Sequence, residues 1–332
     1  MQPNSQISRR LRLRDLHYLL TVVQTGSMAK AATLLSVSQP VISKVIADME
    51  HALGARMLDR SPRGVEPTIY GRQLLASSFA IFDELRHGVI EVEHMLDNAG
   101  GELSIGSNEA STLGIVPSAI NELRRRHPRV FVQVVLVNTP AEQRQELLRR
   151  TIEMSIGRIW RDAPDPQIES EILFDEQFVV VVGPHNPWKQ RGRVELSELV
   201  DRPWILPPIQ NLSGQLVADI FRRKGLEAPA SRVRTSSIQL TQRLLEAGSF
   251  LTMLPTSVLP ALTACSDLRA LPVPLPDLAA PIGIMKLKGR KLSPVAQIFI
   301  DAAHAAARAI PVSEPGSIAY SPTLPVSSLN RF

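Results

Sequence analysis

The sequence has little that would mark a secreted, membrane-spanning or disulfide-stabilised protein. Its 332 residues include one cysteine, Cys265, which excludes a disulfide framework and a cysteine-ligated zinc finger and is typical of a small core hydrophobe. No apolar run approaches the ~20 residues that cross a bilayer. The N-terminus is polar and arginine-rich and lacks the apolar stretch of a signal peptide. Together these absences predict a cytoplasmic protein.

The chain also lacks the motifs that common enzymes carry. GxSxG, P-loop, GxGxxG and HExxH patterns do not occur in it. His87 and His94 fall on one face of a helical stretch with Glu91 between them, where a metal site is conceivable but a solvated helix surface is favoured. We therefore expect no enzyme, no metal and no cofactor.

Positive charge is concentrated at the N-terminal end of the chain. The formal net charge is +5, and residues 1–72 alone hold ten Lys and Arg against five Asp and Glu. These residues therefore account for the whole excess. A basic end on a neutral body predicts contact with phosphate groups.

Residues 27–54 predict two helices joined by a very short turn. Ser27 is a good N-cap for the first helix and Ser38 for the second, whose first turn also accommodates Pro40. Gly54 supplies the C-terminal stop. Apolar residues recur at helical spacing along the second helix: Val41, Ile42, Val45, Ile46, Met49 and Leu53. This arrangement is that of a helix-turn-helix.

The second of these helices carries a short polar set away from its apolar stripe. Gln39, Ser43 and Lys44 project from its first turns. Side chains at that end of a recognition helix read base edges in the major groove of DNA. An ordinary αα-hairpin with a solvated face has the same periodicity, so the flanking motifs decide between the two.

Taken with its flanks, this stretch resembles the N-terminal domain of LysR-type transcriptional regulators. The motifs at family spacing are SxxxAA from Ser27, SQPxxSK from Ser38, LG at Leu53, LDR at Leu58 and PTxxG from Pro67. The resemblance implies an all-α winged helix-turn-helix in residues 1–67. The DNA-contacting residues that it implies are Ser27, Ser38, Gln39, Pro40, Ser43, Lys44, Arg63 and Thr68.

Residues 56–67 predict the β-hairpin wing of that domain. The turn Ser61-Pro62-Arg63-Gly64 separates two short apolar pieces. At its tip, Arg63 either lies near a phosphate or the minor groove or is an ordinary exposed turn residue, and the sequence favours neither interpretation.

Residues 68–97 predict one long helix capped by Thr68. Its apolar residues follow a heptad-like pattern: Leu75, Phe79, Phe82, Val89, Val92 and Leu96. A helix about 45 Å long with an apolar seam needs a partner, so we expect homodimerisation through it, as the resemblance also implies. Residues 68–100 are thus the expected linker helix and hinge.

From residue 101 the pattern changes to alternating strands and helices, which predicts an α/β fold with a parallel sheet. A second lobe of the same kind begins with the apolar strand 178–182, and the chain is expected to return to the first lobe after 250–254. Two lobes with two crossings resemble a periplasmic-binding-protein-like module, which is the effector domain of LysR-type regulators and here spans 101–310. The tail, 311–332, is rich in proline and serine and should be disordered.

Ligands of two-lobed α/β modules bind between the lobes, where strands end and helices begin. The positions of this kind are Ser107, Asn108, Glu109, Ala110, Ser111, Thr139, Arg158, Pro207, Ser213 and Ser236. Plain N-capping by Ser111 or Thr112 is an equally good interpretation of the first group. Arg158, at the expected first crossing, either pairs with an anionic effector or lies on the surface. Glu109 disfavours an acidic ligand and suits a polyol.

The resemblance implies a one-component bacterial regulator that binds a double-stranded DNA operator and responds to a small-molecule effector. The most similar branch includes regulators of sugar-binding-protein and protocatechuate genes, so a sugar and an aromatic or organic acid both remain open. A homodimer that pairs into a DNA-bending tetramer, contact with RNA polymerase and a place in the nucleoid follow from the resemblance too. The alternatives are a two-lobed enzyme or solute-binding protein with an added helical domain, and a nucleoid-type DNA binder without a ligand.

Overall fold

The computed structural model describes residues 11–61, 64–95, 101–159, 165–230, 232–276, 278 and 280–310. Predictions for Arg63, for the linker after residue 95 and for the tail 311–332 fall outside these ranges. The chain divides into an N-terminal unit, Met1–Ala99 with Leu148–Arg150, and a C-terminal unit, Gly100–Leu147 with Thr151–Phe332. No described helix is long and apolar enough to cross a membrane.

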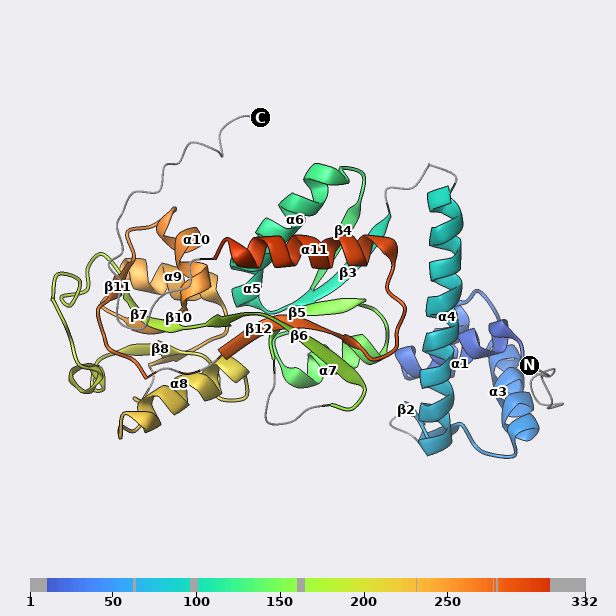
Figure 1. Ribbon diagram of the computed structural model, residues 1–332. Coiled ribbons are helices and arrows are strands. Elements are labelled where there is room, and N and C mark those ends of the chain that lie inside the picture. The colour runs from blue at the N-terminus through green and yellow to red at the C-terminus, as the bar shows by residue number, and fades with distance from the viewer. Residues whose placement is uncertain are drawn as a thin grey trace. The chain divides into compact units, whose positions relative to one another are not determined.

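The N-terminal unit consists of helices around one core, with a two-stranded wing (Figure 1). Its elements are α1 (Leu13–Thr25), α2 (Met28–Leu34), α3 (Gln39–Leu53), β1 (Leu58–Ser61), β2 (Gly64–Pro67) and α4 (Ile69–Met95). Leu19, Ala31, Ile42 and Ile46 are fully buried where α1, α2 and α3 meet. Strands β1 and β2 pair antiparallel. The predicted winged helix-turn-helix is confirmed.

The start of α4 is fixed against the wing by a threonine and a glycine. The Thr68 hydroxyl donates to the Arg56 carbonyl at 2.7 Å and accepts from the Gly71 amide at 3.0 Å, which is the predicted cap. A Cβ on Gly71 would lie 2.0 Å from the Met57 carbonyl oxygen. Only glycine therefore allows α4 to begin this close to the strand.

The apolar seam predicted along α4 combines residues from two different faces. Leu75 is buried in the core of the N-terminal unit, and Phe79 and Phe82 pack against that core. The exposed apolar residues of this helix, beyond its first turn, are instead Ile81, Leu85, Val89 and Val92. The prediction was wrong about Leu75, Phe79 and Phe82 because helical periodicity does not tell which of two apolar faces the helix's own domain already covers.

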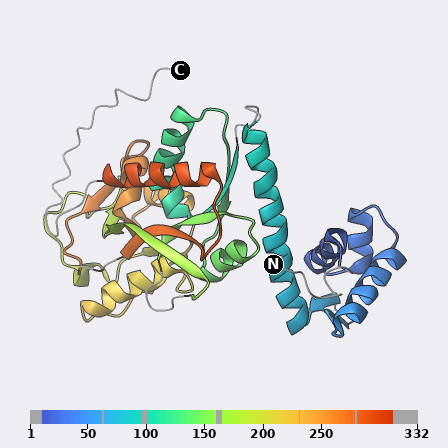
Figure 2. The same ribbon diagram turned by 45° about the vertical axis from the view of Figure 1, so that its right-hand side comes forward.

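The first lobe of the C-terminal unit is a five-stranded sheet with helices on both faces (Figures 1 and 2). Its strands are β3 (Glu102–Ser107), β4 (Phe131–Leu136), β5 (Met154–Arg158), β6 (Ile168–Glu176) and β12 (Ala280–Leu287), in the order β4-β3-β5-β12-β6. Its helices are α5 (Glu109–Leu113), α6 (Ile115–Arg126), α7 (Pro140–Leu148) and α11 (Pro294–Arg308). Helices α6 and α11 pack side by side over one face and α7 covers the other. The core between sheet and helices includes Ile105, Leu123 and Phe299.

The second lobe is also a five-stranded sheet between helices. Its strands are β7 (Phe178–Val182), β8 (Trp204–Leu206), β9 (Val233–Arg234), β10 (Leu251–Pro255) and β11 (Arg269–Leu271), in the order β11-β7-β10-β8-β9. Its helical segments are η1 (Leu196–Leu199), α8 (Leu212–Arg223), α9 (Ile238–Ala247), η2 (Thr256–Val258) and α10 (Leu259–Thr263). Trp204 packs edge-on against Phe221 of α8, while Ile205 faces α9. Cys265, expected in the core, is exposed.

Both sheets are mixed, which corrects the parallel prediction. Strand β3 pairs parallel with β4 and β5, but β12 pairs antiparallel with β5 and β6. In the second lobe β7 pairs antiparallel with β10 and β11. The chain leaves the first lobe through β6, so the first crossing lies at Gln177 and not at Arg158. The predicted return to the first lobe, through β12, is confirmed.

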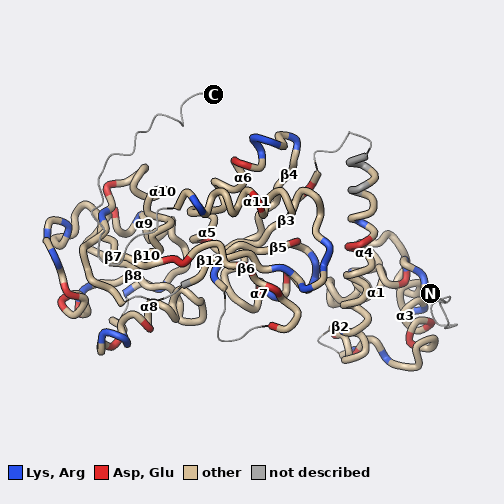
Figure 3. The backbone as a smooth tube through the Cα atoms, in the orientation of Figure 1, with Lys and Arg blue, Asp and Glu red and all other residues tan. Residues whose placement is uncertain are grey.

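Clusters of basic residues end two helices of the C-terminal unit. Arg124, Arg125 and Arg126 form the last turn of α6 (Figure 3), and Arg222 and Arg223 lie in the last turn of α8. Cations at these positions complement the negative end of the helix dipole. Local helix electrostatics therefore accounts for this charge without a phosphate ligand.

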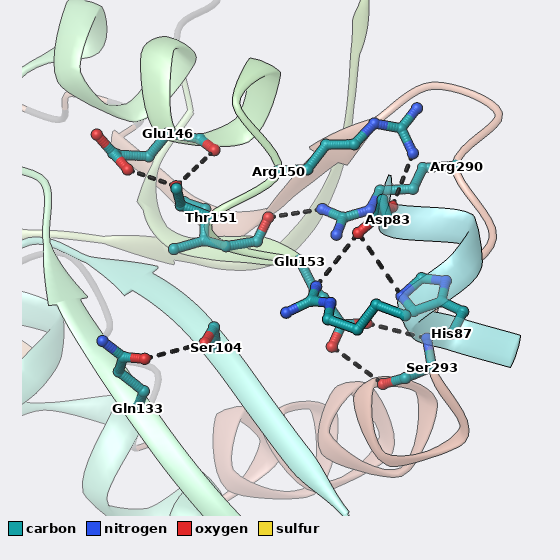
Figure 4. A network of polar contacts seen from close by, with 12 residues as sticks. Asp83, His87, Ser104, Gln133, Glu146, Arg150, Thr151, Glu153, Arg290 and Ser293 are labelled. Carbon is teal, nitrogen blue, oxygen red and sulfur yellow. Dashed lines mark hydrogen bonds and ion pairs between the residues drawn. The ribbon is translucent and has the colours of Figure 1, made fainter. Parts of the chain in front are cut away.

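A buried carboxylate joins the returning chain to the first lobe (Figure 4). Glu153, just before β5, accepts from the amide of Ser293 at 2.9 Å and from its hydroxyl at 3.1 Å. The Arg290 guanidinium donates to the Ile152 carbonyl at 2.6 Å. These bonds fix the start of α11 beside β5, and with it the frame from which the residues at the end of β5 extend.

Candidate DNA-reading helix and ligand cleft

The first turns of α3 face solvent because the opposite side of the helix is in the core. Ile42 and Ile46 are fully buried against α1 and α2. Gln39 and Lys44 are exposed and Ser43 is half-buried. The residues predicted to read bases thus lie together on the outward side of one helix start.

The serines and the proline around α3 determine how the chain enters this helix. The Ser27 hydroxyl accepts from the Lys30 amide at 3.4 Å and so caps α2. Ser36 has a φ of +54°, which makes the tight turn between α2 and α3. Ser38 is the N-cap residue of α3, but its side chain makes no capping hydrogen bond, and Pro40 follows in the first turn. The hydroxyl of Ser38 is therefore available for contact outside the protein.

A cavity opens between the two lobes of the C-terminal unit, at the ends of β3, β4 and β5. It encloses about 860 Å³, part of which is open to solvent. The predicted ligand-binding residues that line it are Asn108, Glu109, Ala110, Thr139, Arg158, Pro207, Ser213 and Ser236.

Two of the predicted ligand-binding residues are not part of the cavity wall. Ser107 is fully buried and its hydroxyl donates to the Asn108 carbonyl at 3.2 Å. The amide of Ser111 donates to the Asn108 side chain at 2.8 Å. Asn108, and neither Ser111 nor Thr112, is therefore the N-cap of α5, because its side-chain oxygen reaches the amide three residues on.

Arg158 is buried, which excludes the surface position that the sequence left open beside pairing with an anionic effector. Its Nη2 donates to Glu176 Oε2 at 2.9 Å, and its guanidinium lies 5.1 Å from the centre of the Phe178 ring. Within the described residues its Nε and Nη1 atoms have no hydrogen-bond partner. A buried donor left unpaired costs about 1–3 kcal/mol, and more when it is charged. Arg158 is therefore a buried cavity-lining side chain that retains unmet hydrogen-bonding capacity.

Glu176 completes this pair from the end of β6. Its other carboxylate oxygen accepts from the hydroxyl of Ser257, which belongs to η2 in the second lobe. Burial raises the pKa of Glu176 and lowers the pKa of Arg158, in each case against the attraction of the opposite charge. The pair lies next to the crossing between the lobes and links both of them.

Glu109 forms a second polar link between the lobes. Its Oε1 accepts from the amide of Ile238, the first residue of α9, at 2.8 Å. Its own amide donates to the Asn138 side chain at 3.2 Å. A carboxylate at a helix N-terminus is stabilised by the free amides and by the helix dipole. The two lobes are thus linked across the cleft by a carboxyl group that the protein itself supplies.

Sequence reasoning does not reveal several groups in and beside the cleft. Glu176, the partner of Arg158 beside the cavity, ends the stretch IESEILFDE, whose alternating acidic residues do not indicate a strand. Gln143 lines the cavity from α7, where its side chain donates to Ser155. Its buried position could not be read from a polar helical stretch. Phe178 opens an apolar strand that predicts only a core position, yet it also lines the cavity.

No group of three or more His, Cys, Asp or Glu side chains able to hold a metal occurs in the described part of the chain. The side chain of His94, one of the pair considered above, lies outside that part.

Two family models match the chain. One, described as "Bacterial regulatory helix-turn-helix protein, lysR family", covers residues 13–72, and the other, "LysR substrate binding domain", covers residues 97–308. The matched regions contain α3 and the cleft respectively. Both models describe parts of regulators and not of enzymes.

Similar curated proteins align with this chain over most of their own length and most of its length. The HTH-type transcriptional regulator YdcI of Escherichia coli is 28% identical over 306 residues, which is 91% of this chain and 98% of that protein. GbpR of Azospirillum brasilense is 26% identical, over 94% of this chain and 92% of its own. A solved structure of full-length CbnR with its target DNA aligns with a TM-score of 0.62 at 22% identity, over 89% of this chain and 100% of that one. This structural similarity shows that the two chains share a fold.

Proposed function

The chain belongs to the LysR family of transcriptional regulators, and we propose that it reads its operator with the first turns of α3 and responds to a small molecule in the cleft between its lobes. It is a DNA-binding regulator with an effector-binding domain and not an enzyme. The division that we propose assigns residues 1–67 to DNA binding, 68–100 to dimerisation and hinge, and 101–310 to the effector.

The exposed polar start of α3 is the observation that carries the DNA-reading proposal. Gln39 and Ser43 would contact base edges, and Lys44 a base or a neighbouring phosphate. The position of the domain on the sugar-phosphate backbone of the DNA would be set by Ser27, Ser38, Pro40, Arg63 and Thr68. The hydroxyls of Ser27 and Thr68 already serve as helix caps, so for these two we propose contact through the helix starts that they order.

Homodimerisation through α4 is supported by its exposed apolar stripe. Ile81, Leu85, Val89 and Val92 are each between 42% and 56% exposed and follow one another at helical spacing. An apolar stripe of this kind on a long helix is stabilised by pairing with a second copy. The edge strand β4 also exposes apolar side chains, with Val134 at 37% and Leu136 at 58% exposure on one face, and this supports pairing of dimers into a tetramer.

Effector binding in the cleft is supported by its chemistry. The cavity combines apolar walls with a few convergent polar groups, which is the usual composition of a small-molecule site. The regulator would act in the cytoplasm, on the nucleoid and with RNA polymerase.

Operator binding is tested by selecting genomic DNA fragments with the full-length protein. The fragments recovered should share a dyad-related sequence, and the protein should bind it at least about a thousandfold more tightly than random DNA at the same salt concentration. Equal affinity for selected and random fragments would reject sequence-specific reading by α3.

A further inference from the structure

Glu109 already supplies the negative charge that the start of α9 attracts. Its carboxylate bonds to the Ile238 amide at 2.8 Å, from the opposite lobe. A helix N-terminus facing a cleft is a common place for the anionic group of a ligand. In this chain that place is taken, so a ligand carboxylate would meet a carboxylate there and not free amides.

Arg158 offers hydrogen bonds and little net charge. It is the one basic residue among the described residues that line the cavity, and Glu176 already neutralises it at 2.9 Å. Its Nε and Nη1 still lack acceptors among the residues that the structure describes. A ligand carboxylate beside Arg158 would therefore compete with Glu176 for the same guanidinium, and one at the start of α9 would compete with Glu109 for the Ile238 amide. Charges interact strongly in such a poorly solvated space, so the cavity disfavours an added anion.

The remaining polar wall consists of amides and hydroxyls. Asn108, Thr139 and Gln143 contribute from the first lobe, and Asn211 and Ser213 from the second. Such groups pair best with ligand hydroxyls, which donate and accept at once. A hydroxyl can also give Arg158 the acceptor that it lacks without adding charge.

Within the effector response proposed above, we propose that the ligand is a small uncharged polyhydroxy compound, such as a monosaccharide or sugar alcohol, with a hydroxyl oxygen that accepts from Arg158. Glu109 is the specificity-determining residue of the site. It holds the lobes together and disfavours the acid that corresponds to the preferred sugar.

Matched ligand pairs test this assignment on the full-length protein. Galactose and galacturonate, or glucose and glucuronate, differ only where a hydroxymethyl group is replaced by a carboxylate. Across a panel of such pairs and sugar alcohols, at least one uncharged compound should raise the melting temperature by about 2–4 °C, and its acid should do so less at the same concentration and ionic strength. Titration calorimetry gives the two dissociation constants.

Glu109→Gln removes the charge but keeps an oxygen that can accept from the Ile238 amide. The ratio of acid to sugar affinity should rise about tenfold in this variant. Glu142→Gln is the matched control, because Glu142 accepts from the amides of Asn138 and Thr139 at 2.9 and 3.1 Å within one lobe. It should leave the ratio unchanged.

Three results would overturn the inference: tighter binding of the acid by the unmodified protein, equal shifts in the two variants, or no stabilisation by any uncharged member of the panel. Operator binding is measured on the same samples without ligand. A protein that binds its operator and prefers acids would retain the proposed function and lose only this assignment of ligand class.

Discussion

Arg158 and Glu176 meet in a nearly water-free place, with 3% and 1% of their side-chain surfaces exposed. The removal of two charges from water is compensated only when their mutual bonds are complete, and here two guanidinium nitrogens find no partner in the described part of the chain. At the scale of residues the pair is therefore better understood as part of the ligand site than as a device for stability. That distinction has a measurable consequence for the free energy of unfolding.

Glu176→Gln should lower the free energy of unfolding by about 3–5 kcal/mol, because it leaves the buried guanidinium without its counter-charge. The double variant Arg158→Met, Glu176→Gln should recover most of this loss, since it removes both charges and keeps the volume. Urea denaturation of the two variants and the unmodified protein gives the comparison. Equal losses would mean that packing, and not charge, is what the pair contributes.

Asp165 gives the stability a pH dependence on the acid side. The amide of Gln167 and the guanidinium of Arg144 hold the pKa of Asp165 below its ordinary value of 3.8. The folded protein therefore releases this proton more readily than the unfolded chain, and the stabilisation is complete above the ordinary pKa and disappears as the pH falls through the lowered one. Melting temperatures measured from about pH 5 down to about pH 3 should fall less steeply for Asp165→Asn. An unchanged slope would contradict the assignment.

At the scale of elements, the strands with apolar runs could be predicted closely from the sequence. The predicted apolar strand 178–182 coincides with β7, and the runs ELSIGS and WIL coincide with β3 and β8. Strand β6 could not be predicted in this way, because it lies at the edge of its sheet and is mostly exposed. Edge strands need no apolar alternation, so their sequences resemble loops.

The same limit of local sequence patterns explains which residues of the candidate site could be predicted. Residues that follow a predicted strand or begin a predicted helix, such as Thr139 and Ser213, could be placed near the cavity from sequence alone. The partners of Arg158 and Glu109 could not. Each bond depends on a segment from another part of the chain, β6 for Arg158 and α9 for Glu109. Local patterns do not specify which segments meet.

The start of α3 should separate base reading from phosphate contact. Gln39→Ala and Ser43→Ala should each weaken operator binding by about 1–3 kcal/mol and leave binding to random DNA nearly unchanged. Lys44→Ala serves as the comparison. If Lys44 contacts only phosphate, its loss should weaken binding to operator and random DNA alike and reduce the salt dependence by about one charge. Competition binding at several salt concentrations measures these effects. A uniform loss on both DNAs in the Gln39 and Ser43 variants would exclude base reading by these residues.

Helix α4 should show different roles for its two apolar faces. Leu85→Glu should convert the dimer to monomers with little effect on the melting of the N-terminal unit, because Leu85 is 52% exposed. Phe82→Glu should instead destabilise that unit, since Phe82 packs on its core. Sedimentation and thermal melting distinguish the two outcomes. Dimers that persist in the Leu85 variant would place the interface elsewhere.

At the scale of the whole molecule, the described polar side-chain links between the lobes differ in position and chemistry. Glu176 bonds to Ser257 beside the crossing, where the chain itself already joins the lobes. Glu109 bonds to Ile238 across the cleft, away from the crossing. If the Glu176–Ser257 bond is lost, the polypeptide crossing beside it still joins the lobes. If the Glu109–Ile238 bond is lost, the lobes can separate at the cleft. Glu109 is therefore expected to control the population of the closed form without ligand.

Hydrogen exchange of the full-length protein can detect that population. Glu109→Ala should speed exchange of the Ile238 amide and the neighbouring first turn of α9, because the carboxylate that protects it is gone and the cleft opens more often. Glu142→Ala should speed exchange only at Asn138 and Thr139, within the first lobe. A sugar that bridges the lobes should restore slow exchange at α9 in the Glu109 variant, since it would replace the missing link. If α9 exchanged equally in both variants, the lobes would be held together by their apolar contacts, and Glu109 would act on ligand charge alone.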